Sequence, residues 1–183
     1  MFENRPLRST ALFLLVLLCL ASGFTHPARA GIEEDARAAL SELYRLVPGT
    51  EALAKKAKGV LVFPNIVKAG LLIGGEYGEG VLFEKGAAAG RYNIVSASYG
   101  LQIGAEAYSL ALFFMTDEAL AYLDKSGGFE LGVDAGFAVA DVGKGGQLTT
   151  SNVQDPIMAF VYGQAGLMAG ISIEGSKITR LED

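Results

Sequence analysis

Five basic side chains gather in the stretch from Arg45 to Lys68, where the only acid is Glu51. Each lysine held near an anionic lipid surface contributes on the order of 1 kcal/mol to attachment, and this attraction fades within a Debye length. The stretch therefore predicts a weak, salt-sensitive contact with anionic headgroups. The candidate contact residues are Lys55, Lys56, Lys58 and Lys68, with Arg45 as a weaker fifth. The alternative is that the lysines only stabilise the end of a helix, which needs no ligand.

Beyond the first thirty positions, the chain lacks the residue types on which most catalytic mechanisms depend. The chain has one cysteine, Cys19, and one histidine, His26, so thiolate, imidazole and zinc-thiolate sites are excluded downstream of them. Two carboxylate pairs, Glu76 with Glu79 and Asp134 with Asp141, keep a hydrolase as a minor alternative. The odd spacing of Glu76 and Glu79 places them on opposite faces of a regular strand, which argues against that alternative. We expect a non-enzymatic protein with no cofactor and no metal.

The first thirty residues have the pattern of a secretory signal peptide. Two arginines precede an apolar run at 11–21, and a small-x-small site ends at Ala30. We expect cleavage after Ala30, a single domain over 31–183 and a periplasmic location. Two alternatives stay open, a retained anchor and a lipoprotein acylated at Cys19. Mass spectrometry of the native N-terminus decides among the three.

The charge of the chain argues against a nucleic-acid partner. The full chain carries a net charge of −5, and loss of the first thirty residues, which hold three arginines and one acid, takes it to −7. A generally acidic domain is repelled by a phosphate backbone. We therefore expect an anionic phospholipid or membrane surface as the partner, contacted through the basic stretch, and no nucleic acid. A protein partner, bound by an envelope scaffold without lipid specificity, is the alternative.

Periodicity predicts an α+β fold. Apolar residues at helical spacing predict an amphipathic helix over 32–47, and Thr50 is expected to cap a second helix that ends at Gly59. Thr116 begins a third helix, inserted among short strands expected at 60–63, 69–75, 80–83, 92–100, 101–114, 129–142, 157–162, 167–173 and 176–181. The predicted architecture packs the N-terminal amphipathic helices on a Gly-rich, mostly antiparallel, curled sheet that is barrel- or sandwich-like.

Glycine punctuates these strands. The chain has 24 glycines, and the densest run lies at 74–80. This run lacks the spacing of a dinucleotide-binding loop and precedes a strand rather than a helix. It is therefore expected to form a hairpin turn, as is the glycine run at 143–146.

Four glycine-anchored blocks, in order along the chain, resemble the SYLF family, first described in a yeast actin-patch protein and widespread in bacteria. The blocks are Lys58–Gly70 running on into Gly74–Val81, then Ser98–Ala105, Gly132–Ala135 and Gly166–Ser176. The resemblance covers nearly all of the chain after residue 30.

The resemblance implies lipid binding. Eukaryotic relatives attach to phosphoinositide-bearing membranes through basic residues and an amphipathic N-terminal segment, and some also bind actin filaments. For an exported bacterial protein, the resemblance supports recognition of anionic phospholipid in general and no named headgroup.

Overall fold

The computed structural model describes residues 28–70, 73–99, 104–125, 128–132, 137–142, 155–166, 173 and 175–182. The chain divides into two units, Met1–Ala30 and Gly31–Asp183. The fold below is that of the second unit. The expected turn at 143–146, most of the expected strand at 167–173 and Asp134 lie outside the described residues.

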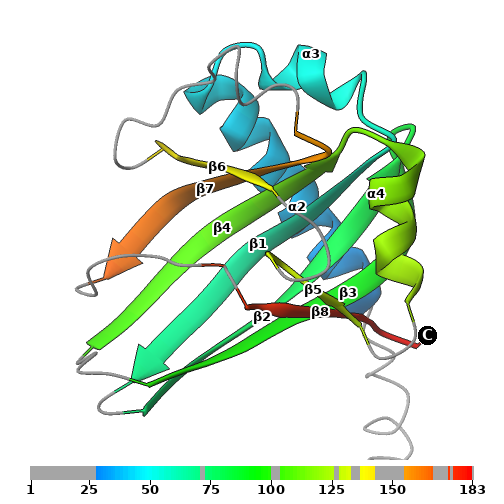
Figure 1. The fold of residues 1–183 in the computed structure, drawn as a ribbon. Helices are drawn as coiled ribbons and strands as arrows, with labels where there is room; N and C mark the ends of the chain where they lie inside the picture. Colours follow the sequence, from blue (N-terminus) through cyan, green and yellow to red (C-terminus); the bar gives the residue numbers. More distant parts are fainter. Residues whose placement is uncertain are drawn as a thin grey trace, which may run out of the picture. The chain divides into compact units, whose positions relative to one another are not determined.

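The described strands form one eight-stranded sheet with the order β5-β8-β3-β2-β1-β4-β7-β6 (Figure 1). Their bounds are β1 Gly59–Gly70, β2 Ile73–Glu84, β3 Ala87–Tyr99, β4 Gly104–Phe114, β5 Phe129–Glu130, β6 Ala138–Asp141, β7 Ile157–Gly166 and β8 Lys177–Arg180. Every pair in this order is antiparallel except β6 with β7, which is parallel. The predicted fold class, a helix-covered, curled and mostly antiparallel sheet, is confirmed.

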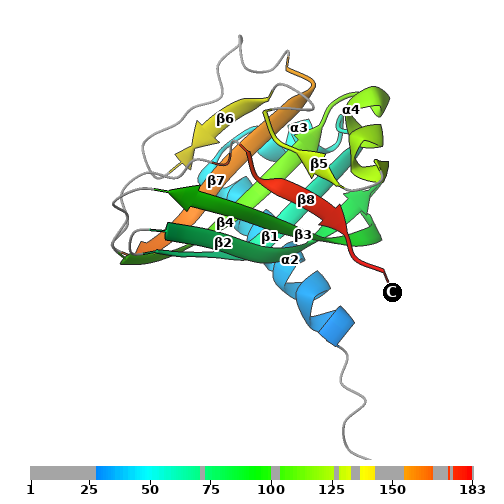
Figure 2. The ribbon, with the colours of Figure 1, turned by 60° about the horizontal axis from the view of Figure 1, so that its bottom comes forward.

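The sheet buries apolar side chains on both faces, because alternate residues of its central strands point to opposite sides. We call the face that carries Leu61 and Phe63 the inner face and the face that carries Val60 and Val62 the outer face. The sheet curls, so that residues of β5, β7 and β8 join the inner core (Figure 2). Pro64 lies where the register of β1 shifts against both neighbours, and this bulge is held by the Ser109 hydroxyl, which donates to the Pro64 carbonyl at 2.8 Å.

Two helices cover the outer face. Helix α2 (Ala28–Leu46) turns Ala36, Ala39 and Leu43 into the outer core, as the predicted amphipathic spacing requires. Helix α3 (Thr50–Ala54) is shorter than expected and ends before the lysines. The expectation that Thr50 caps it was wrong, because Gly49 is the cap residue, with φ 95°, and the buried Thr50 hydroxyl donates to the Val47 carbonyl at 2.7 Å.

The inserted helix lies against the inner face. Helix α4 (Asp117–Ala121) continues into the 3-10 helix η1 (Tyr122–Asp124), and together they bury Ala119 and Leu123 in the inner core. The Thr116 hydroxyl accepts a hydrogen bond from the Ala119 amide at 3.1 Å, so the predicted cap is confirmed.

The glycine run at 74–80 is not a turn, contrary to the prediction. It lies inside β2, and the expected strand at 69–75 is in fact the end of β1 and the start of β2, with Ala69 paired to Gly75. Two glycines of the run, Gly78 and Gly80, are required by packing against β1. A Cβ at Gly78 would meet the Ile66 side chain at 2.7 Å, so only glycine allows β2 to approach β1 this closely.

None of the helices in the described residues is long and apolar enough to cross a bilayer.

Candidate functional site

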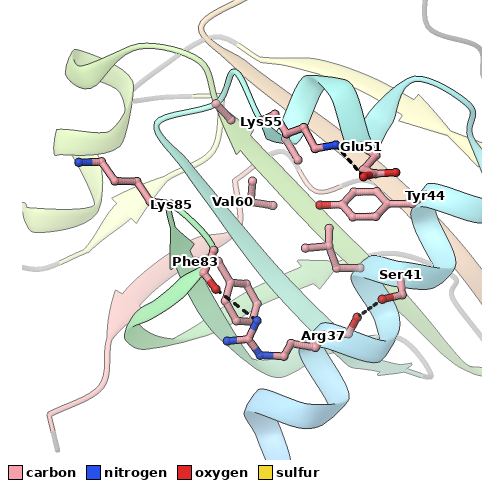
Figure 3. Close-up of a pocket in the computed structure, with 12 residues that line it drawn as sticks. Arg37, Ser41, Tyr44, Glu51, Lys55, Val60, Phe83 and Lys85 are labelled. Atoms are coloured by element: carbon pink, nitrogen blue, oxygen red, sulfur yellow. Dashed lines mark hydrogen bonds and ion pairs between the residues drawn. The ribbon is translucent and has the colours of Figure 1, made fainter.

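A cleft of about 680 Å³ opens where α2 and α3 meet the ends of β1 and β2 (Figure 3). Its apolar floor is formed by Leu40, Val60 and Phe83, and the Tyr44 ring lies beside it. Burial and, second, the nearby Glu51 raise the pKa of Tyr44 above its ordinary value, so Tyr44 stays a neutral hydrogen-bonding group at physiological pH. The cleft therefore offers an apolar base with a polar rim.

Cations outnumber acids around this rim. Arg37, Lys55 and Lys85 line the cleft against the single acid Glu51. The Lys55 ammonium lies 2.8 Å from the Glu51 carboxylate, and this hydrogen bond together with the lysine charge lowers the pKa of Glu51. Both side chains are mostly exposed, so the pair is weak and Lys55 can exchange its partner for a ligand.

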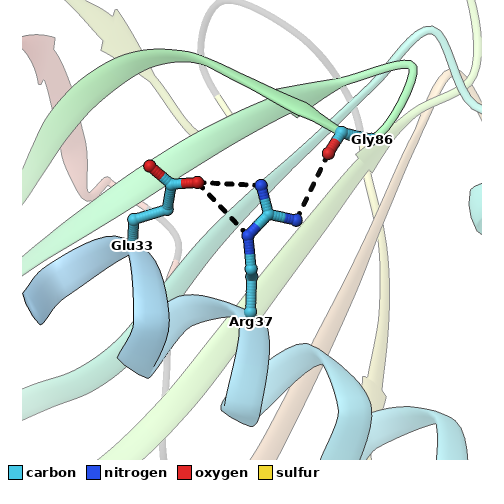
Figure 4. Close-up of polar contacts among 3 residues, drawn as sticks. All are labelled: Glu33, Arg37 and Gly86. Atoms are coloured by element: carbon cyan, nitrogen blue, oxygen red, sulfur yellow. Dashed lines mark hydrogen bonds and ion pairs between the residues drawn. The ribbon is translucent and has the colours of Figure 1, made fainter. Parts of the chain in front are cut away.

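Arg37 joins the helix to the sheet beside the cleft (Figure 4). Its guanidinium donates to the Glu33 carboxylate at 2.8 and 3.2 Å and to the Gly86 carbonyl at 3.3 Å. It also lies over the Phe83 ring, 4.7 Å from the centroid. Arg37 thus ties α2 to the turn between β2 and β3 beside the cleft, and its charge is partly offset by Glu33.

The five basic residues predicted as headgroup contacts do not form one surface. Lys55 lines the cleft, Lys56 is exposed in the turn that follows α3, and Lys58 is exposed and paired with Asp117 at 3.0 Å. Arg45 is exposed on α2, where it lies 3.7 Å from Glu42. Lys68 is only 5% exposed and points from β1 to the inner face, away from the other four.

Sequence reasoning missed Arg37 and Lys85. Arg37 is on the exposed side of an amphipathic helix, where a basic residue is ordinary. Lys85 has a positive φ of 50° and precedes Gly86 with φ 82°, so the two form the tight turn between β2 and β3. The Lys-Gly pair between two apolar runs was the available signal for a hairpin, but it carried no indication that this hairpin meets α2.

The carboxylates considered for acid/base chemistry are separated as their spacing predicted. Glu76 is buried on the inner face, where it accepts hydrogen bonds from the Tyr108 hydroxyl at 2.9 Å and the Ser176 hydroxyl at 2.7 Å. Glu79 lies on the outer face and pairs with Arg91 at 3.0 Å. The two therefore cannot act as an acid/base pair on one substrate. In the second pair, Asp141 accepts from Gln164 at 2.7 Å, while Asp134 lies outside the described residues.

Two buried tyrosines make the fold sensitive to alkali. Burial raises the pKa of both Tyr108 and Tyr162 well above the ordinary value of 10.0, with Glu76 and Glu42 as the next causes. The folded state keeps protons that the unfolded chain loses above pH 10, so the contribution of these two tyrosines to the free energy of unfolding is constant below that pH and falls above it. Each tyrosine contributes up to about 1.4 kcal/mol per pH unit. Urea unfolding between pH 8 and 11.5 checks this. The double variant Tyr108→Phe/Tyr162→Phe should flatten the slope, and an unchanged slope would assign it to other groups.

Comparison with known proteins gives one family. The model of the Ysc84 family, described as "Las17-binding protein actin regulator", matches residues 95–183. The rat SH3 domain-containing YSC84-like protein 1 is 32% identical over 127 residues, which are 66% of this chain and 37% of that protein. Protein YSC84 of Saccharomyces cerevisiae is 28% identical over 131 residues, 68% of this chain and 28% of that protein.

The chain thus spans well under half the length of these relatives. The matches to them are longer than the family-model match, so they also include residues upstream of position 95.

Proposed function

We propose that this chain, which belongs to the Ysc84 (SYLF) family, binds anionic phospholipid headgroups at a membrane surface without catalysis. The observation that carries this proposal is the cleft, because it combines an apolar floor with three rim cations and one rim acid. A phospholipid needs both: a positive rim for the phosphate and an apolar base for the glycerol and the first carbons of the chains.

The candidate contacts are Lys55, Lys85 and Arg37 in the cleft and Lys56 beside it. Lys58 and Arg45 are exposed and can add a weaker long-range attraction, although each has an acidic partner. Lys68, at 5% exposed, is not available to a membrane surface in this state. We further propose that the chain is exported to the periplasm, where it meets the anionic lipids of the envelope.

Co-sedimentation with vesicles tests the proposal. We expect binding to phosphatidylglycerol vesicles at low salt, little binding to phosphatidylcholine vesicles, and loss of binding at high salt. The variant Lys55→Ala/Lys85→Ala should weaken binding about thirtyfold, because each of the two cations near the surface contributes on the order of 1 kcal/mol.

The matched control is Lys125→Ala/Lys177→Ala, which removes the same charge at η1 and β8, away from the residues that line the cleft. It should bind like the unmodified chain. Equal binding to both kinds of vesicle, or equal loss in the two double variants, would overturn the cleft as the lipid site.

A protein-binding role without lipid specificity is the second candidate. The family is described as a Las17-binding protein and actin regulator, which supports a protein partner. The outer face also leaves Val67, Tyr77 and Val95 about half exposed beside α2. Absence of vesicle binding by the folded chain would favour this second role.

A further inference from the structure

Three ionisable side chains lie in one row across the inner face of the sheet. Lys68 of β1 stands directly opposite Glu76 of β2 on one side and Glu106 of β4 on the other. They are 5%, 3% and 8% exposed, respectively. Charged side chains are almost never buried to this degree without close partners, because each loses several kcal/mol of hydration.

Only one of the three is satisfied by the fold. Both oxygens of Glu76 accept hydrogen bonds, from Tyr108 and from Ser176. In contrast, the buried Oε2 atom of Glu106 has no hydrogen-bond donor among the described residues. Lys68 makes no ion pair or hydrogen bond with the described residues either. Lys68, which is 5% exposed, and the buried Glu106 oxygen thus lie on neighbouring strands, and neither has a partner in the described part of the chain.

The next set of cross-strand partners on the same face consists of glycines, which have no side chains. Two positions beyond Lys68 lies Gly70, which is paired with Gly74 on β2 and Gly104 on β4. Three adjoining strands therefore present only backbone immediately beside the unpaired charges. At this row, the three strands place no side chain between a small polar group and the ends of Lys68 and Glu106.

We propose that Lys68 and Glu106 bind a small zwitterion, whose phosphate or carboxylate pairs with the Lys68 ammonium and whose ammonium donates to Glu106. A simple anion would leave Glu106 without a donor and would be repelled by two carboxylates. A simple cation would satisfy Glu106 but would leave the Lys68 ammonium without a hydrogen-bond acceptor. A ligand with both charges satisfies both side chains and leaves the net charge of the row unchanged. This site lies on the opposite face of the sheet from the cleft and does not depend on the lipid function of that cleft.

Isothermal titration calorimetry of the full chain tests the proposal. The probes are phosphoethanolamine and glycine, and the half-ligands are inorganic phosphate and ethanolamine. At least one zwitterion should bind saturably and at least tenfold more tightly than either half-ligand. Lys68→Met and Glu106→Gln should each weaken that binding at least tenfold. Lys177→Met and Glu79→Gln, which remove the same charges from an exposed position of β8 and from the outer face, should leave it unchanged.

Three further measurements extend the test, and the first of them uses no variant. Amide chemical shifts of the unmodified chain should move on titration at 66–70, 74–78 and 104–108, the three strands that carry the row. Lys68→Arg, which keeps the charge, should retain binding. Vesicles of phosphatidylethanolamine distinguish a membrane headgroup from a soluble zwitterion, because only the former source predicts vesicle binding that Lys68→Met abolishes. No saturable binding, half-ligands as tight as the zwitterion, or shifts confined to the outer cleft would overturn the proposal.

Discussion

Replacement of Gly80 by alanine is expected to lower the free energy of unfolding by about 3 kcal/mol, at the upper end of the usual cost of overpacking. Gly80 lies on the inner face of β2, and an added Cβ would lie 2.6 Å from the Phe63 ring and 2.6 Å from the Val62 carbonyl oxygen. Neither the ring nor the carbonyl can move aside without a large loss of stability, because Phe63 is fully buried and the carbonyl belongs to the paired strand β1. Urea denaturation of the unmodified and variant chains measures the difference.

Gly75→Ala is the matched control, because it makes the same change on the same strand. Its added Cβ would meet only the Ser96 carbonyl, at an ordinary contact distance of 3.5 Å, on an exposed part of the strand. A change within about 0.5 kcal/mol is expected, and a small gain is possible since alanine restricts the unfolded chain. Equal losses in both variants would mean that the strand resists any side chain, and would refute the packing explanation.

The same contact explains why the sequence predicted a turn where the structure has a strand. The seven residues at 74–80 include four glycines, which is typical of turns. Rules that consider only neighbouring residues in the sequence give no other explanation for so many glycines. The actual reason lies in β1, where Phe63 and Ile66 occupy the space that side chains at Gly80 and Gly78 would need. A constraint set by a neighbouring strand cannot be found from the glycines alone. By contrast, the Thr116 cap and the spacing of α2 depend on nearby residues, and both predictions were right.

The residues of the candidate site likewise include some that the sequence could predict and some that only the fold reveals. Lys55 was predicted because it lies in a visible basic cluster, but Arg37 and Lys85 reach the cleft from α2 and from the β2–β3 hairpin. Only the docking of α2 on the sheet brings these distant residues together. Lys68 was grouped with the cluster because it is near in sequence. Its period of two with Ile66 puts the two residues on one face, but the register shift at Pro64 is what turns that face inward, and this bulge cannot be found from the period alone.

The two faces of the sheet therefore differ in how exposed their charged side chains are. On the outer face the cations are exposed, paired weakly and free to exchange partners with a surface. On the inner face the charges are buried and their environment is fixed by the strands. An effect of salt is expected for the first set and not for the second, because buried charges are screened much less. Salt dependence thus separates vesicle binding at the cleft from zwitterion binding at the inner row.

Glu76→Ala is expected to lower the free energy of unfolding by about 3 kcal/mol, because removal of one partner leaves other buried polar groups unsatisfied. The Tyr108 and Ser176 hydroxyls both donate to this carboxylate, and Ser176 is 0% exposed, so water cannot easily replace it. Ser176 precedes β8, which is paired with the edge of β3. The loss should therefore appear in global denaturation and also as faster amide hydrogen exchange in β8, where this contact holds the C-terminal strand to the sheet.

Glu79→Ala tests whether burial and hydrogen bonding, rather than loss of a carboxylate from β2, cause this effect. Glu79 has two partners as well, the Tyr77 hydroxyl at 2.9 Å and Arg91 at 3.0 Å, but it lies on the outer face in partial contact with solvent. Its removal should cost less than about 1 kcal/mol, since water can solvate what remains. Similar losses for the two variants, or unchanged exchange in β8 of Glu76→Ala, would show that the inner carboxylate does not hold the sheet closed.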